Sequence, residues 1–200
     1  MKFVMATHNP NKVRELSRIL EPLQIEVVLA ENLNEVEETG TSFEENAYLK
    51  AAAACKETGF PAVADDSGLC VHVLNGQPGV HSARWAGPDA KDSDRNQKLL
   101  AALKDVPKKD RLATFVSVIC CVFPSGDILT SRGECQGVIA NEPHGTDGFG
   151  YDPLFLVGEK TYAQMTAEEK DQVSHRGKAL RQFAENLKNY KEIGRASCRE

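Results

Sequence analysis

Two long stretches of strand-type sequence follow one another in the second half of the chain, and they constrain its fold more than any other feature. They cover Arg111–Phe123 and Asp127–Ile139 and are joined at the tetrapeptide PSGD, a pattern that predicts a β-hairpin. The remaining β-type and helical runs mix without a strict β-α-β alternation. The sequence therefore predicts an α/β protein with a mixed β-sheet and flanking helices, and not a doubly wound parallel sheet.

The other elements are predicted from hydrophobic periodicity and from the residues that start helices. Further strands are expected at Lys2–Ala6, Ile25–Ala30, Pro61–Ala64, Leu69–Leu74 and Leu154–Val157. Helix starts are expected at Asn9 before Pro10, at Ser42 and Thr166 with the capping-box partners Glu45 and Glu169, and at Ser93 and Ser174. The second helix is expected to end near Gly59 and the third near Lys104.

Length and charge limit the class of protein. The 200 residues fit one domain or two closely joined lobes, and we expect a single domain over residues 1–191. We interpret Glu192–Glu200, including Cys198, as a non-native tail, because this segment has no apolar periodicity and follows a helix that looks finished. A net charge of -5 gives no electrostatic footprint for nucleic acid.

Apolar stretches and cysteines indicate the compartment. The longest apolar stretch, Ala113–Phe123, is too short to span a bilayer, and the polar start of the chain does not resemble a signal peptide. The six cysteines form no C-x-x-C pair, so we expect reduced core thiols and neither structural zinc nor disulfides. These features predict a cytoplasmic protein that binds neither a membrane nor nucleic acid.

The hexapeptide ADDSGL places two adjacent carboxylates, Asp65 and Asp66, directly after an apolar run that indicates a buried strand. One interpretation is a strand that ends in a polar turn, because Asp, Ser and Gly are ordinary turn residues. The other is a site for a divalent cation, because buried carboxylates need hydrogen bonds, cations or protonation. Mg²⁺ suits such a site, since one or two carboxylates plus substrate phosphates satisfy it.

The first half of the chain holds three weaker candidates for phosphate or metal binding. Thr7–Lys12 precedes and opens a helix whose free N–H groups suit a phosphate, but a plain capped turn explains it as well. Glu37 and Glu38 could join a metal site or form a solvated acidic loop. Lys50 could contact phosphate or serve only solubility.

The second half holds two candidates for base recognition. In GFGYDP, Gly148–Pro153, the glycines permit close backbone approach and the Phe149 ring could stack on a base, although a core turn is the alternative. In SHRGKA, His175 and Arg176 could donate to a base or a phosphate, or could only cap a helix and add surface charge. Together the candidates suggest a nucleoside triphosphate, Mg²⁺ and hydrolysis.

Several long segments, in order, make the sequence similar to a known family. They are ATHNPNKVREL, EETGTSFEENAYLKA, ADDSGLCVHVLNGQPGVHSARWAG, GFGYDPLF and EEKDQVSHRGKAL. The chain resembles the Ham1-like inosine/xanthosine triphosphate pyrophosphatases over nearly its whole length. The resemblance implies an elongated mixed-sheet α/β fold (Maf/Ham1-like) with two lobes around a nucleotide-binding cleft, and a homodimer. It also implies Mg²⁺-dependent hydrolysis of dITP, ITP and XTP to the monophosphate and pyrophosphate.

The resemblance also implies roles for individual residues. Phosphate contacts are expected from Thr7, His8, Asn9, Pro10, Asn11, Lys12 and Lys50; metal binding from Glu38 and Asp66; and base or nucleotide contacts from Ser67, Phe149, Gly150, Tyr151, Asp152, Lys170, His175 and Arg176. Asp66 is expected to be the proton acceptor. The chain departs from the family pattern at His8 and at Asp147, where many members have glycine.

A mechanism follows as a hypothesis. Asp66 would orient or deprotonate a water that attacks the α-phosphorus, with Asp65 adjusting Asp66, while Lys12 and Lys50 stabilise the departing pyrophosphate. A donor from His175, Arg176 or the backbone would select a 6-oxo purine. Two alternatives stay open: a Maf-like pyrophosphatase acting on pyrimidine or modified nucleotides, and a nucleotide-binding sensor without activity.

Overall fold

The computed structural model describes residues 2–29 and 33–197, with side chains described as far as Glu192. The contacts of the chain divide it into two compact units. The first, unit 1, comprises Met1–Asp66, Ser117–Gly133 and Arg176–Glu200, and the second, unit 2, comprises Ser67–Val116 and Glu134–His175.

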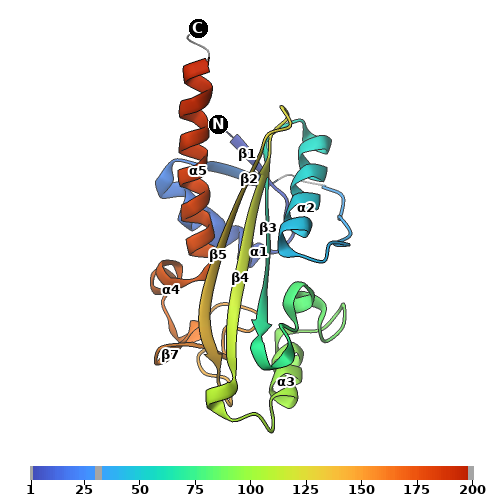
Figure 1. The fold of residues 1–200 in the computed structure, drawn as a ribbon, viewed down its shortest axis with the longest axis vertical. Coiled ribbons are helices and arrows are strands. Elements are labelled where there is room, and N and C mark those ends of the chain that lie inside the picture. The colour runs from blue at the N-terminus through green and yellow to red at the C-terminus, as the bar shows by residue number, and fades with distance from the viewer. Residues whose placement is uncertain (1, 30–32, 198–200) are drawn as a thin grey trace. The chain divides into compact units, whose positions relative to one another are not determined.

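The strands form a mixed sheet, as predicted. Their order is β2-β1-β3-β4-β5-β6-β7, and Figure 1 shows the long strands β3, β4 and β5 side by side. The bounds are β1 Lys2–Met5, β2 Glu26–Leu29, β3 Ala62–Val71, β4 Leu112–Val122, β5 Ile128–Ile139, β6 Phe155–Val157 and β7 Lys160–Thr161. Strand β1 is parallel to β2 and β3, whereas β6 is antiparallel to β5 and β7.

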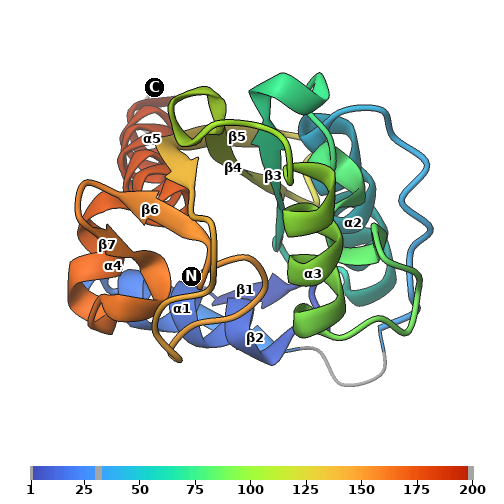
Figure 2. The same cartoon turned by 90° about the horizontal axis from the view of Figure 1, so that it is seen from below.

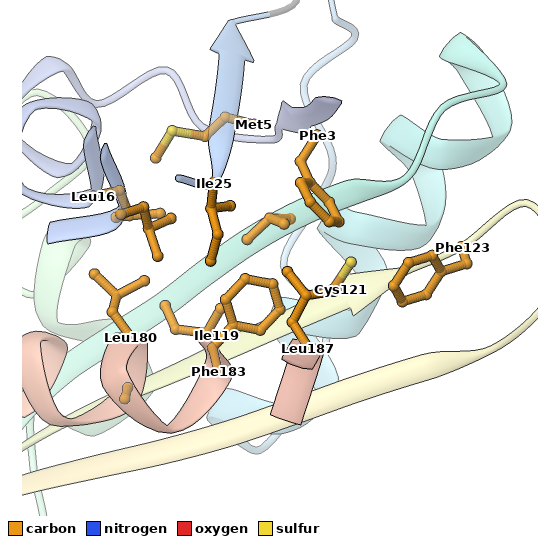
Figure 3. Packing of buried hydrophobic residues seen from close by; sticks show 13 residues of the cluster. Phe3, Met5, Leu16, Ile25, Ile119, Cys121, Phe123, Leu180, Phe183 and Leu187 are labelled. Atoms are coloured by element: carbon orange, nitrogen blue, oxygen red, sulfur yellow. The ribbon is translucent and has the colours of Figure 1, made fainter. Parts of the chain in front are cut away.

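In unit 1, two helices pack on one face of the strands. Helix α1, Pro10–Leu20, begins as predicted, because the Asn9 side chain accepts hydrogen bonds from the first turn. Helix α5, His175–Ser197, is the last of the described elements. Figure 3 shows Leu180, Phe183 and Leu187 of α5 directed toward Leu16 of α1 and toward β-strand residues. Burying each such side chain contributes about 1.5–3 kcal/mol.

Helix α2, Phe43–Thr58, also belongs to unit 1 and lies on the other side of β3 from α5 (Figure 1). Its predicted capping box between Ser42 and Glu45 is present, and its predicted end at Gly59 is confirmed by a left-handed C-cap. Alanines at 47, 51 and 54 form its buried stripe, and the helix packs against β1.

Unit 2 has its own apolar core. It is built from the ends of β3, β4 and β5 that belong to this unit, helix α3 (Asp92–Ala102) and β6. Helix α4, Ala167–Val173, lies beside β6 and β7, as Figure 2 shows, and is fixed to β7 by the Lys160–Glu169 ion pair of 2.9 Å. The predicted capping box of Thr166 and Glu169 is present.

Three predictions about the elements are wrong. Pro61–Ala64 and Leu69–Leu74 are not separate strands: β3 runs without interruption through ADDSGL, and residues 72–74 form a 3₁₀ turn. Helix α3 begins at Asp92 and not after Ser93, because the Asp94 carboxylate accepts the Lys91 N–H at 2.8 Å. Helix α5 continues to Ser197, so it is not finished before Glu192.

Two predictions fall partly outside the described residues: the strand Ile25–Ala30 at Ala30, and the tail Glu192–Glu200 at its last three residues, which include Cys198. Among the described cysteines, Cys55, Cys120, Cys121 and Cys135 are free and buried, as expected for core thiols, whereas Cys70 is free but only half-buried. In the part of the chain that the structure describes, no helix combines the length and apolarity needed to cross a membrane.

Candidate active site

The two aspartates of ADDSGL lie inside β3, so successive side chains point to opposite faces of the sheet. The interpretation of this segment as a polar turn is therefore wrong. Asp65 faces α1 and α5, where Lys12 and Arg176 bind it, whereas Asp66 meets Lys50 of α2. Each carboxylate thus has its own cationic partners, and each forms its own cluster in unit 1.

The acidic cluster consists of Glu38, Lys50 and Asp66. Lys50 Nζ donates to Glu38 Oε1 at 2.7 Å, to Asp66 Oδ1 at 2.8 Å and to the Asp65 carbonyl at 3.1 Å. Lys50 is therefore not a solubility residue. Asp66 is 5% exposed, and its Oδ2 has no hydrogen-bond partner within the described residues.

Burial and charge act in opposite directions in the acidic cluster. Burial raises the pKa of Asp66, although the Lys50 ammonium opposes this shift. For Lys50, burial acts to lower the pKa, but the carboxylates of Asp66 and Glu38 outweigh it and raise the pKa. A carboxylate whose pKa is raised by burial is a stronger proton acceptor than a free carboxylate.

The Asp65 network occupies the other face and joins Lys12, Glu15, Asp65, Ser117 and Arg176. Ser117 Oγ donates to Asp65 Oδ1 at 2.6 Å, while Lys12 Nζ and Arg176 Nη2 lie 2.7 and 3.2 Å from Asp65 Oδ2. Arg176 also pairs with Glu15. Burial opposes ionisation of Asp65, but Arg176 and Lys12 outweigh it and hold its pKa well below the usual range.

The Asp65 network changes how several predicted residues are placed. Arg176 is 2% exposed and His175 3% exposed, so the interpretation of this pair as capping plus surface charge is wrong. The Asp65 side chain, expected to adjust Asp66, is instead held by Lys12 and Arg176. Glu15 and Ser117 were not predicted as site residues. Glu15 lies in the segment ATHNPNKVREL but carries no local signal of its distant partner Arg176, and Ser117 lies in none of the quoted segments.

The predicted phosphate segment Thr7–Lys12 lies at the start of α1. Thr7 Oγ1 accepts the Asn9 N–H at 3.2 Å, and Asn9 Oδ1 accepts the Asn11 and Lys12 N–H groups at 2.9 and 3.4 Å. His8 and Pro10 are exposed. The segment thus combines a helix N-terminus with polar side chains, and its Lys12 reaches the Asp65 network.

Unit 2 contains most of the residues that are predicted to contact the base. The predicted base-binding loop, Phe149–Asp152 (the base loop), is closed by Asp152 Oδ2, which accepts hydrogen bonds from the Phe149 N–H at 3.0 Å and from Lys170 Nζ at 2.6 Å. Lys170 Nζ also lies 5.1 Å from the centre of the Phe149 ring. At Gly148, where φ is +76°, a Cβ would lie 2.0 Å from Asp152 Oδ2, so only glycine fits there.

His175 is held by stacked aromatic rings. Its imidazole stacks on Phe115 with centroids 4.6 Å apart and planes at 8°, and on Tyr162 at 6.1 Å and 13°. Phe115 and Tyr162 were not predicted as site residues, because an aromatic in a strand or a turn carries no local signal of its partner. The predicted Ser67 follows Asp66 directly in β3 and is half-buried, and Tyr151 donates from its hydroxyl to the Ser82 carbonyl at 2.9 Å.

The clusters define the kind of site. Within the described residues, no group of three or more His, Cys, Asp or Glu side chains could hold a metal ion. Unit 1 offers a pair of carboxylates, Glu38 and Asp66, together with the ammonium groups of Lys50 and Lys12 and the N-terminus of α1. Unit 2 offers stacked rings and a buried ion pair. Groups of the first kind suit an anionic ligand, and groups of the second kind suit an aromatic one.

Comparisons with known proteins identify the family. The profile of the Ham1 family matches residues 3–186, so the chain belongs to the Ham1 family. A HAM1 protein from Coxiella burnetii superposes with a TM-score of 0.86 at 42% identity, covering 94% of this chain and 99% of that one. A nucleoside-triphosphatase, or dITP/XTP pyrophosphatase, from Mycobacterium abscessus gives 0.73 at 48% identity, covering 90% and 96%.

Sequence relatives agree with the structural comparison. The dITP/XTP pyrophosphatase of Symbiobacterium thermophilum is 48% identical over 195 residues, which is 96% of this chain and 98% of the relative. The dITP/XTP pyrophosphatase of Escherichia coli O157:H7 is 49% identical over 194 residues, or 94% and 98%.

Proposed function

We propose that this protein hydrolyses non-canonical purine nucleoside triphosphates, namely dITP, XTP and ITP, to the nucleoside monophosphate and pyrophosphate. Membership of the Ham1 family and the names of its relatives support this function. The observation that carries it is the acidic cluster, in which Lys50 joins Glu38 to Asp66 while Asp66 Oδ2 keeps unused acceptor capacity.

The acidic cluster fits a divalent cation, and we propose Mg²⁺. The buried Asp66 Oδ2 without a hydrogen-bond partner is a hard oxygen available to a cation, and Glu38 is the second carboxylate. Two carboxylates suffice, because Mg²⁺ keeps waters and binds substrate phosphates. When bound, the ion would neutralise charge on the phosphates.

Asp66 is the proposed proton acceptor. It would take a proton from a water whose oxygen forms a bond to the α-phosphorus, while the bond from the α-phosphorus to the bridging oxygen breaks and pyrophosphate leaves with that oxygen. The contact between Asp66 and Lys50 would hold the Asp66 carboxylate in place for this role. Lys50 and Lys12 would offset the negative charge of the leaving group.

Base recognition is the proposed task of unit 2. The Phe149 ring would stack on the purine, since every base has a π-face. A donor from His175 or the backbone would bond O6 of hypoxanthine or xanthine, and adenine would leave that donor unpaired. The stacked Phe115 would fix the plane of His175. For the assembly and compartment we propose a cytoplasmic homodimer, as the family resemblance implies.

A substrate panel tests the proposal. Incubation with ITP, XTP, dITP, GTP, ATP and UTP plus Mg²⁺ should release pyrophosphate, not orthophosphate, from the first three. A preference for UTP would favour the Maf-like alternative, and binding of ITP without turnover would favour the sensor. Either outcome, or release of orthophosphate only, contradicts the proposed function.

A further inference from the structure

Helix α3 of unit 2 carries two side chains that bind one residue of the base loop. Asp92 Oδ2 accepts the Gly150 N–H at 2.7 Å, and Asn96 Nδ2 donates to the Gly150 carbonyl at 3.0 Å. Residues four apart lie on the same face of a helix, so both can reach Gly150 at once. The peptide groups on the two sides of Gly150 are therefore each held by α3.

Gly150 is a residue that needs such external contacts. Its φ of +62° lies in the left-handed region, which glycine adopts readily but does not prefer over others. A Cβ at Gly150 would meet nothing within 4 Å, so side-chain packing does not fix this position. The bonds from Asp92 and Asn96 supply the restraint that the residue itself lacks.

The two side chains are themselves fixed. Arg95 forms an ion pair with Asp92 and donates to the carbonyls of Ala83 and Ala90 at 2.8 and 2.6 Å. Asn96 is only 7% exposed. A group whose rotamer is held by neighbouring contacts can position another with little loss of entropy.

We propose that Asp92 and Asn96 are positioning residues for base recognition. By fixing the Gly150 peptide, they hold the Phe149 ring beside the Lys170–Asp152 ion pair, in the orientation needed for stacking on a purine. This inference rests on the proposed function. Loss of either residue is expected to lower substrate affinity and base discrimination, and to leave the phosphoryl transfer in unit 1 unchanged.

The test compares Asp92→Ala and Asn96→Ala with Asp94→Ala. Asp94 lies in the same helix turn as Asp92, and its carboxylate caps α3 by accepting the Lys91 N–H. The Asp94→Ala variant therefore loses one negative charge, as Asp92→Ala does, and a helix cap, but keeps both hydrogen bonds to Gly150. Hydrogen exchange of the Gly150 amide should accelerate in Asp92→Ala. In Asp92→Ala and in Asn96→Ala, KM for ITP should rise on the order of tenfold, with a smaller change in kcat. The ITP-to-ATP ratio of kcat/KM should fall in both variants. Asp94→Ala should leave these quantities unchanged.

Two conservative variants separate positioning from stability. Asp92→Asn keeps an acceptor for Gly150 N–H and should recover the ITP-to-ATP ratio, whereas Asn96→Asp keeps the size but loses the donor and should not. Unchanged Gly150 exchange and an unchanged ratio in Asp92→Ala would overturn the proposal. The exchange measurement needs no turnover, so a wild-type protein inactive on ITP would overturn the proposed function alone.

Discussion

Asp65 and Asp66 are consecutive in β3, and their carboxylates are bound by different cations. Lys12 Nζ lies 2.7 Å from Asp65 Oδ2, and Lys50 Nζ lies 2.8 Å from Asp66 Oδ1. The alternation of a strand separates two like charges that would repel one another on a single face. It also gives them different environments, since Asp65 is saturated by donors whereas Asp66 keeps an unused oxygen.

Asp66→Asn should abolish turnover and leave the fold intact. The amide cannot accept the proton of the attacking water, and loss of a general base lowers kcat by roughly 10²–10⁴-fold. The release of pyrophosphate from ITP measures the loss, and circular dichroism checks the fold. Asp89→Asn, at an exposed position, is the matched control and should be fully active. Activity within a few-fold of the wild type in Asp66→Asn would remove Asp66 from its role.

Asp65→Asn should mainly lower the free energy of unfolding. Removing one partner of a buried ion network leaves the charges of Lys12 and Arg176 poorly compensated, which costs about 3–5 kcal/mol of unfolding free energy. Urea denaturation measures this loss.

Ser117→Ala is the control for Asp65→Asn. It removes one hydrogen bond to the same carboxylate and no charge, so a loss of about 1 kcal/mol is expected. Equal losses in the two variants would mean that the charge of Asp65 does not stabilise the network.

The separation of the two aspartates could not be predicted from the sequence, although most of the fold could. The hairpin at PSGD and the capping boxes at Ser42 and Thr166 are local signals, and the structure confirms them. The continuity of β3 depends on its neighbours β1 and β4 and on cations from distant helices. The turn-type residues in ADDSGL favoured a break in the strand, and the tertiary contacts of β3 override that local propensity.

The residues of the candidate site also differ in whether the sequence could predict them. Motifs and the family resemblance pointed to Asp66, Lys50 and the base loop. No local pattern pointed to Phe115 or Asn96, because their partners lie 60 and 54 positions away along the chain. Contacts of that separation are fixed by topology and not by local sequence.

Glu38→Gln should raise the Mg²⁺ requirement. Loss of one of two carboxylates weakens oxygen coordination, and we expect the Mg²⁺ concentration for half-maximal activity to rise on the order of tenfold. Titration of Mg²⁺ into protein treated with a chelator measures this shift. Glu37→Gln changes the neighbouring exposed carboxylate and should behave as the wild type. Equal Mg²⁺ requirements in the two variants would exclude Glu38 as a ligand.

The capping carboxylate of Glu45 should make the stability of α2 depend on pH. Hydrogen bonds from Thr41 lower the pKa of Glu45 below 4.5, so the folded state favours the charged form. Its contribution is present above the unfolded pKa and is lost as pH falls through the folded pKa. The Tm difference between wild type and Glu45→Gln should therefore be present at pH 6 and shrink as the pH falls below the unfolded pKa of about 4.3. A difference that does not shrink on acidification would contradict this origin.

Phe115→Leu should weaken base discrimination through His175. The Phe115 ring stacks on the imidazole at 4.6 Å with planes 8° apart, and leucine cannot hold that plane. Phe155→Leu is the matched control, because Phe155 packs on Phe115 and Tyr162 in the same core. Both variants should lose about 1–1.5 kcal/mol of unfolding free energy. Only Phe115→Leu should lower the ITP-to-ATP ratio of kcat/KM, and an equal fall in both would assign the effect to general loosening of the core.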